Sequence, residues 1–255
     1  MILRRFMQNI KEQNWFAVGL DMMVVMLGIF FGLQITELNE ERNDRSNGIK
    51  YLQRIKEDIE TDLQTFEFSL KLTDERIHQI NLLQKFASDP QLSFENPAEF
   101  VSSIERGAWN SLLYIEARTW EELVSSGRTL LIKDIRIRNG IFDYYRSIGR
   151  WDAILDDFDA RIKFINATAG LLSIEQLTAI EESSMKDKPI ESFLSVNSED
   201  ARSLALQLSN NQEARRWLPK MIQYHMLAKK VLEKRIKHAE ELLGFITRKL
   251  EDNNE

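Results

Sequence analysis

Asp21 is the residue whose surroundings could give it unusual chemistry, because it is a single acid inside an apolar stretch. The stretch covers residues 15–35 and reads WFAVGLDMMVVMLGIFFGLQI. An acid well inside a membrane helix costs about 2.5–3.5 kcal/mol on insertion scales unless it meets water or a partner. Three roles follow: a hydrated group at the membrane boundary facing Arg4, Arg5 or Lys11, a contact between paired helices, or part of a proton or ion path.

Two small residues in the same stretch could bring helices together. Gly28 and Gly32 are four residues apart, the spacing that lets two membrane helix backbones approach closely. Gln34 adds an amide that could form a hydrogen bond between helices. These three residues are our candidates for membrane helix packing and for self-association of the chain.

Other reactive side chains stand alone. The three histidines are His78, His225 and His238. None belongs to a zinc-binding motif, so we interpret each as a surface or core histidine. Asp156, Asp157 and Asp159 point in diverging directions on a helix and are typical of a solvated face. The absence of cysteine excludes disulfides and thiol chemistry. The sequence therefore predicts no catalytic residue, no cofactor and no metal site, and a protein that is not an enzyme.

The element that positions Asp21 is a helix over residues 15–36. The 21 positions of the stretch 15–35 make about 31 Å of helix, which matches a hydrocarbon core of about 30 Å. A cleaved signal peptide is the alternative, but the run is longer than a signal core and lacks a small-residue cleavage site. Lysine and arginine are slightly denser before the run than after it. We expect the N-terminus inside the cytoplasm and the large domain outside it.

An amphipathic helix is expected to continue from the membrane segment until Asp89 and Pro90 end it. Its apolar positions recur every three or four residues: Leu52, Ile55, Ile59, Leu63, Phe66, Leu70, Ile77, Ile80, Leu83 and Phe86. The last helix is more regular, with Leu232, Ile236, Ala239, Leu243, Ile246 and Leu250. That 3.5-residue period requires a helical partner. The first helix, packed antiparallel, is the expected partner, and a self-associating coiled coil is the alternative.

Capping residues predict shorter helices between these two. They begin at Asn96 with Pro97, at Thr119 with Glu122, at Ser173 with Gln176, and at Ser198. Gly127 is expected to end the second of them. Residues 135–169 keep the apolar spacing of one long helix. No segment alternates with period two, so we predict an all-α fold.

The predicted architecture is an N-terminal transmembrane helix that continues into an elongated antiparallel helical bundle. We divide the chain into a short basic segment (1–14), the transmembrane helix (15–36) and a helical extramembrane domain (37–255). Outside residues 1–36 there are 31 basic and 38 acidic residues, a net charge of −7. This mild acidity argues against nucleic acid as a partner.

Two stretches together resemble an uncharacterised bacterial family of single-span membrane proteins. The first is DMMVVMLGIFFGLQI followed by TELNEER, and the second is TWEELVSSG followed by IKD and the pair Tyr144 and Tyr145. Asp21 stands where many members carry Glu, and TELNE replaces a tryptophan-containing exit from the membrane. The resemblance implies topology and carries no activity. The span is also similar to the acid-bearing span of stator-type subunits of proton-driven motors.

These observations lead to one functional hypothesis and two alternatives. The hypothesis is a membrane-anchored interaction or scaffold protein of the cell inner membrane, with the lipid bilayer and either a second copy or another membrane protein as partners. The first alternative is a transport or energy-coupling subunit that works through Asp21. The second is a ligand-sensing helical bundle.

Overall fold

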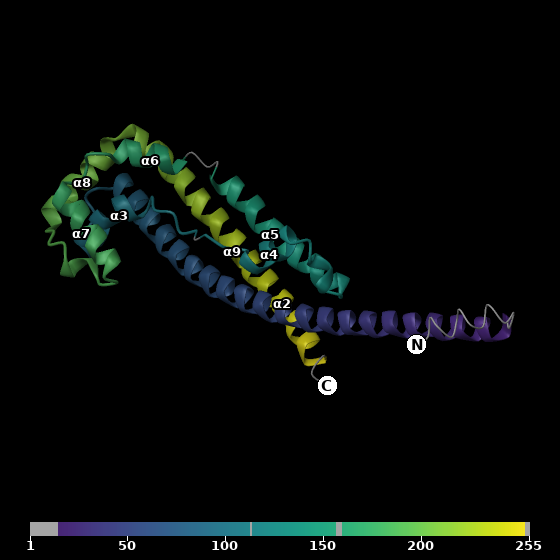
Figure 1. Cartoon of the computed structure of the whole chain (residues 1–255). Coiled ribbons are helices and arrows are strands. Elements are labelled where there is room, and N and C mark those ends of the chain that lie inside the picture. Colours follow the sequence, from purple (N-terminus) through teal and green to yellow (C-terminus); the bar gives the residue numbers. More distant parts are fainter. Residues whose placement is uncertain (1–14, 113, 157–159, 253–255) are drawn as a thin grey trace.

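The computed structural model describes residues 15–112, 114–156 and 160–252, and every regular element there is helical. Figure 1 shows a bundle at one end and a long protruding helix at the other. The elements, in chain order, are α2 (Trp15–Ser88), α3 (Pro97–Arg106), α4 (Arg118–Ser125), η1 (Thr129–Leu131), α5 (Ile135–Asp156), α6 (Ala160–Thr168), α7 (Ile174–Met185), η2 (Ile190–Ser192), α8 (Ser198–Asn210) and α9 (Gln212–Asp252). The all-α prediction is confirmed, whereas the predicted segment 1–14 lies outside the described residues.

Helix α2 is one continuous helix of 74 residues. It contains the whole apolar run from Trp15 and ends at Ser88, directly before Asp89 and Pro90, as predicted. At 1.5 Å per residue it is about 110 Å long. The apolar run and the folded bundle therefore share a single helix with no break between them.

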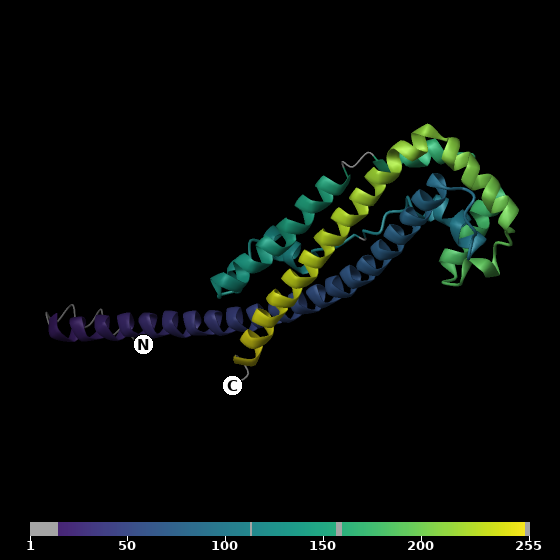
Figure 2. The ribbon, with the colours of Figure 1, turned by 180° about the vertical axis from the view of Figure 1, so that it is seen from behind.

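Helix α9 packs along α2 in the opposite direction (Figures 1 and 2). Lys229 of α9 forms an ion pair with Asp74 of α2 at 2.7 Å, and Leu250 lies beside Gln53. The C-terminal end of α9 thus returns toward the part of α2 where the apolar run begins to protrude. The predicted antiparallel pairing of the first and last helices is confirmed.

The bundle starts at Gly48, the first fully buried position along α2. A Cβ atom at Gly48 would lie 2.3 Å from the carbonyl oxygen of Leu131, so the absence of a side chain lets η1 rest directly on α2. From there α4, η1 and the second half of α9 pack on α2, and α5 packs on α9 and reaches α2 through Tyr144. We call this part the proximal bundle.

The far end of α2 carries a second group of helices, α3, α6, α7 and α8, packed with the first part of α9. We call this part the head. Phe86, Phe94 and Phe100 form an aromatic cluster at its centre, with the rings of Phe86 and Phe94 stacked 4.1 Å apart. The head and the proximal bundle have separate hydrophobic cores.

Two local predictions differ from the structure. Helix α4 begins at Arg118 instead of being capped by Thr119, because the Asp58 carboxylate of α2 accepts the Thr119 backbone N–H at 3.2 Å. The single helix predicted over 135–169 is described as α5 and α6, with residues 157–159 outside the described part. The caps at Asn96 and Ser173 are confirmed, and Gly127 has the expected positive φ of 69°.

Candidate functional site

The candidate functional surface is the protruding part of α2. Its large apolar side chains are exposed in every direction, with exposed fractions of 83% for Phe16, 60% for Ile29 and 66% for Leu33. Within the described residues, α2 is the one helix that is long and apolar enough to cross a membrane, and its apolar window is not buried. An uninterrupted apolar surface of this kind marks a region that binds lipid or protein.

Helix geometry sorts the predicted packing residues onto faces. At about 100° per residue, Asp21, Gly28 and Gly32 fall within about 40° of one another. Gln34 lies about 160° away from Gly32 and faces another direction. The two glycines thus share a face with the acid, and the amide does not belong to that face.

Nothing in the described chain covers the glycine face. A Cβ atom added at Gly28 or at Gly32 would meet no atom within 4 Å. Asp21 is half-buried, and its Oδ2 has no hydrogen-bond partner among the described residues. Arg4, Arg5 and Lys11, which were expected to face Asp21, lie outside those residues. All three roles predicted for Asp21 stay predictions.

The contact between α2 and α9 has polar residues at core positions. Along α2 the spacings three and four alternate strictly through buried residues, which are Leu52, Ile55, Ile59, Asp62, Phe66, Ser69, Thr73, Arg76, Ile80, Leu83 and Ala87. We call this row the seam, together with the matching row of buried residues on α9, which are Leu218, Met221, His225, Ala228, Leu232, Arg235, Ala239, Leu242 and Ile246. Of the predicted apolar positions, Leu63, Leu70 and Ile77 are only partly buried, and Leu63 and Leu70 pack against the proximal core from its edge. The 3.5-residue period selects the neighbouring polar positions instead.

Asp62 is the acidic residue of the seam. Burial raises its pKa to about 6 from an ordinary 3.8, while the hydrogen bond from Tyr144 of α5 acts in the opposite direction. The Tyr144 hydroxyl donates to Oδ2 of Asp62 over 3.0 Å. Arg235 of α9 lies above the ring of Phe66, 5.6 Å from its centre, and donates to the Ile148 carbonyl over 3.0 Å. These contacts connect α2, α5 and α9 at one level.

A second polar layer lies nearer the head. His225 of α9 is fully buried, and its Nε2 lies 2.9 Å from the carbonyl oxygen of Gly107. Burial lowers the pKa of His225 to about 4, so the ring is neutral at pH 7. Arg76 of α2 is also buried, which lowers its pKa to about 10, and it donates to Gln79. Sequence spacing along both helices could have identified these residues, because each occupies a core position.

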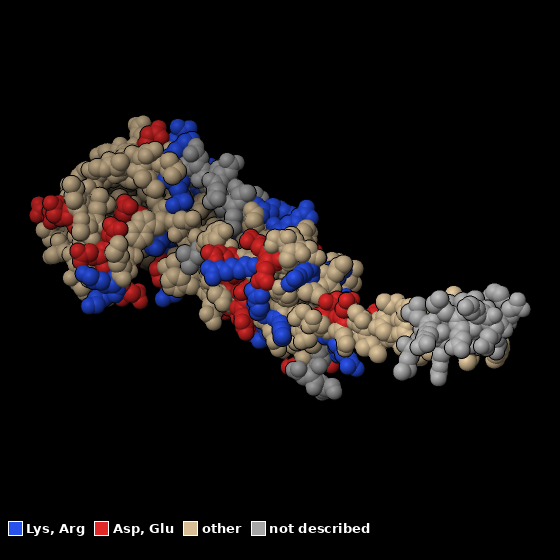
Figure 3. Space-filling view, in the orientation of Figure 1, with Lys and Arg blue, Asp and Glu red and all other residues tan. Residues whose placement is uncertain are grey.

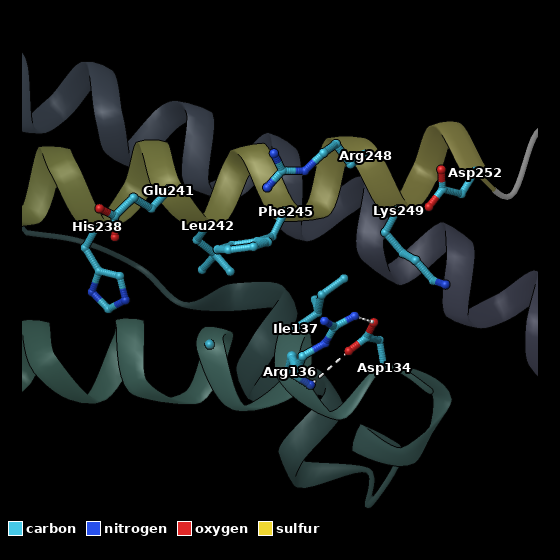
Figure 4. Close-up of a pocket in the computed structure, with 11 residues that line it drawn as sticks. Asp134, Arg136, Ile137, His238, Glu241, Leu242, Phe245, Arg248, Lys249 and Asp252 are labelled. Atoms are coloured by element: carbon cyan, nitrogen blue, oxygen red, sulfur yellow. Dashed lines mark hydrogen bonds and ion pairs between the residues drawn. The ribbon is translucent and has the colours of Figure 1, made fainter.

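A pocket of about 570 Å³ lies between the start of α5 and the end of α9 (Figure 4). Apolar side chains of Ile137, Leu242 and Phe245 line it together with charged residues such as Arg136. Asp134 forms an ion pair with Arg136 and accepts the Arg136 backbone N–H, and these interactions hold its pKa below the ordinary range. The charges in this pocket are of both signs and are partly paired with each other.

Histidines and acids do not gather into a metal site within the described residues. His78 is exposed and lies 3.0 Å from Glu99, His225 is in the core, and His238 faces the ring of Tyr144 at 5.5 Å. Their placement agrees with the surface and core roles expected for them. Asp156, Asp157 and Asp159 have side chains outside the described part of the chain.

The fold and its exposed surface define a class: an all-helical protein in which one long helix presents an apolar run and then forms the backbone of an antiparallel bundle. The chain belongs to a family of unknown function, DUF6090, whose profile matches residues 21–185. The match begins at Asp21 inside the apolar run of α2 and continues through α3, α4, α5 and α6 to the end of α7. Helix α9, the partner of α2, lies beyond it. No curated protein and no solved structure matches the chain.

Proposed function

We propose that this protein is a membrane-anchored helical scaffold that has no catalytic activity of its own. In this proposal residues 15–36 of α2 cross the bilayer once, and residues 37–255 bind or organise other proteins. The observation that carries the proposal is the exposed apolar run on a helix that continues unbroken into a folded bundle. A bilayer covers such a surface on all sides, whereas a single protein partner covers one face.

The proposed orientation places the N-terminus in the cytoplasm and the bundle outside it, at the cell inner membrane. The basic residues that flank the run are Arg4, Arg5 and Lys11 before it, and Arg42, Arg45, Lys50 and Arg54 after it. The first group is denser, and the denser group stays inside. The open face of Gly28 and Gly32 supports self-association of the span, with a second copy or another membrane protein as partner.

Two arginine substitutions in the apolar run test whether it anchors the protein in the membrane. Replacing Leu27 and Phe30 by Arg places two charges in the run, at a cost of about 5–7 kcal/mol for insertion. We expect this variant to leave the membrane fraction on carbonate extraction. The matched control is Gln64→Arg with Phe68→Arg, two exposed positions of the same helix inside the bundle, which should stay membrane-bound. Retention of the Leu27 and Phe30 variant in the membrane would contradict the proposal.

The natural absence of cysteine makes sidedness easy to measure. Single cysteines introduced as Gln8→Cys and Ser46→Cys flank the run on its two sides. The assay uses cells in which only the outer membrane has been permeabilised. A membrane-impermeant maleimide should label Ser46→Cys in these cells, and should label Gln8→Cys only after the inner membrane is permeabilised as well. The reverse pattern would invert the proposed orientation and leave the anchor intact.

A further inference from the structure

The outer face of α7 in the head carries exposed apolar side chains. Ile174 is 79% exposed, Leu177 39% and Met185 76%. With Glu181 they follow spacings of three, four and four residues, so they form one stripe along the helix. The buried residue Ile180 lies on a neighbouring face, about 100° around the helix from the middle of this stripe. Helix α7 is therefore apolar on two faces, and one of them has no cover in the described chain.

A groove of about 620 Å³ runs beside this stripe. Its lining residues are Glu105, Trp109, Leu177, Glu181, Ser184 and Met185. Trp109 forms the opposite wall and is held firmly. Its Nε1 donates to Glu105 over 3.2 Å, and the guanidinium groups of Arg76 and Arg106 lie 5.3 and 5.9 Å from the ring centre. An ordered aromatic side chain facing leucine and methionine is the composition of a protein-binding surface.

The groove has acidic walls and lies in an acidic part of the chain. Residues 170–200 contain seven acids and two lysines, a net charge of −5 out of −6 for the whole chain. Acidic side chains lie at the end of the molecule formed by α7 and α8 (Figure 3). Glu181 makes no ion pair within the described residues, whereas Lys186, one of the two lysines, is paired with Glu182 at 2.7 Å.

These charges decide between the possible occupants. A second copy would place two segments of charge −5 against each other, and like charges across an interface are costly. Anionic lipid would be repelled in the same way. The head also lies at the opposite end of α2 from the apolar run (Figure 1). A segment with an apolar stripe and flanking lysine or arginine residues complements both properties of the groove.

We propose that the groove between Trp109 and α7 is a docking site for a cationic amphipathic helix of a partner protein. The apolar stripe of that helix packs on Leu177 and Met185, and its basic residues meet Glu181 and Glu105. This inference rests on the proposed scaffold function and names the class of partner. A negative result for the groove can be distinguished from a negative result for the membrane anchor, because different variants test the two proposals.

The experiment uses the full chain in nanodiscs of zwitterionic phosphatidylcholine and a fluorescent helical peptide of leucine and lysine. Its leucines are spaced three and four apart. The comparison peptides are a scramble of the same composition and a leucine–glutamate version. The anisotropy measured with empty nanodiscs is subtracted from each value. We then expect the amphipathic cationic peptide to bind, and neither of the two comparison peptides to bind. Raising NaCl from about 0.05 to about 0.5 M should weaken that binding.

Matched variants localise the binding. Met185→Ser and Glu181→Lys should each weaken it by about tenfold or more, because each removes a contact in the groove. The controls make the same changes at exposed positions of α9, as Met226→Ser and Glu240→Lys, and should leave binding within about twofold. All four positions are exposed, so the fold is retained, and circular dichroism checks this.

Three results would overturn the inference. The first is equal binding of the scrambled peptide, and the second is equal loss in the α9 controls, since both indicate nonspecific attraction to an acidic protein. The third is a Met185-dependent contact with a different occupant, seen as self-association of the chain or as binding to phosphatidylglycerol vesicles. Membrane extraction of the Met185→Ser variant should be unchanged in every case.

Discussion

The two parts of α2 show how one helix is adapted to two different surroundings. From Leu20 to Ile35 large apolar side chains point in all directions and none is buried by the described chain. From Leu52 to Ala87 buried positions recur every three or four residues and charged residues fill the outer faces. The helix itself does not change at the boundary. The periodicity of the apolar residues therefore distinguishes a surface that needs an apolar solvent from one that needs a helical partner.

The two parts of α2 also differ in whether their polar residues have hydrogen-bond partners. In the seam, polar groups of α2 meet partners from other elements: Tyr144 donates to Asp62, and Thr73 lies 2.7 Å from Ser111. In the protruding part, the described chain offers no hydrogen-bond partner to Oδ2 of Asp21. Buried polar positions in a helix pair can fix its register and orientation, and the seam has them at several levels.

The largest effect is expected from a substitution that disrupts the packing of the seam and leaves the rest of α2 unchanged. Phe66 is 1% exposed and Phe68, two residues further on, is 52% exposed. Phe66→Ala should lower the free energy of unfolding by about 3–5 kcal/mol, because it opens a cavity in the proximal core. Phe68→Ala should change it by less than about 0.5 kcal/mol. Denaturant titration in detergent followed by circular dichroism measures both, and similar losses would refute the assigned register.

The next effect concerns the pH dependence of the seam. The pKa of Asp62 is raised in the folded state, so its contribution to stability is lost as pH rises from about 4 to about 6. The pKa of His225 is lowered, so its contribution is lost as pH falls from 6.5 to about 4. The two slopes are opposite, each about 1.4 kcal/mol per pH unit, and they offset each other in the natural chain.

Asp62→Asn separates these two contributions. The amide oxygen still accepts from Tyr144, and the remaining slope is that of His225. Unfolding measured between about pH 4 and 6.5 should then show stability increasing with pH by about 2–3 kcal/mol. Glu67→Gln, an exposed change on the same helix, should behave as the natural chain does. A flat profile for Asp62→Asn would show that the buried polar layers are not charged as described.

The smallest effect is expected for self-association through the glycine face of the protruding part. Gly28→Leu and Gly32→Leu should each weaken self-association in nanodiscs by about tenfold, or about 1.4 kcal/mol. Gly19→Leu changes the same residue type on the opposite side of the helix, about 180° from Gly28, and should have no effect. Gln34→Leu should also have none. Energy transfer between labelled copies measures association, and an equal loss for Gly19→Leu would contradict the glycine face.

Local signals in the sequence were sufficient to predict where α3 and α7 begin. The caps at Asn96 and Ser173 are formed by residues within three positions of one another, so their type and spacing decide them. The start of α4 could not be predicted in this way, because Asp58 reaches its backbone from another helix.

The candidate surfaces also differ in whether local sequence signals are enough to predict them. Asp21, Gly28 and Gly32 stand out by residue type alone, and the continuity of α2 then places them on one face. The polar core residues were missed because Leu63 and Leu70 offered an apolar row one position away from the buried one. The groove beside Trp109 could not be predicted, since its two walls come from segments about seventy residues apart that meet only in the folded head.

The unbroken course of α2 also has a mechanical consequence. Residues 37–88 extend about 78 Å beyond the apolar run. Membrane helices change their tilt when the bilayer becomes thinner or thicker. If the run spans a bilayer, a change in tilt of about 10° would swing the far end of α2 sideways by about 14 Å, with α9 bracing the helix along its length. The molecule would then act as a lever, turning a small adjustment in the lipid into a large movement of the groove.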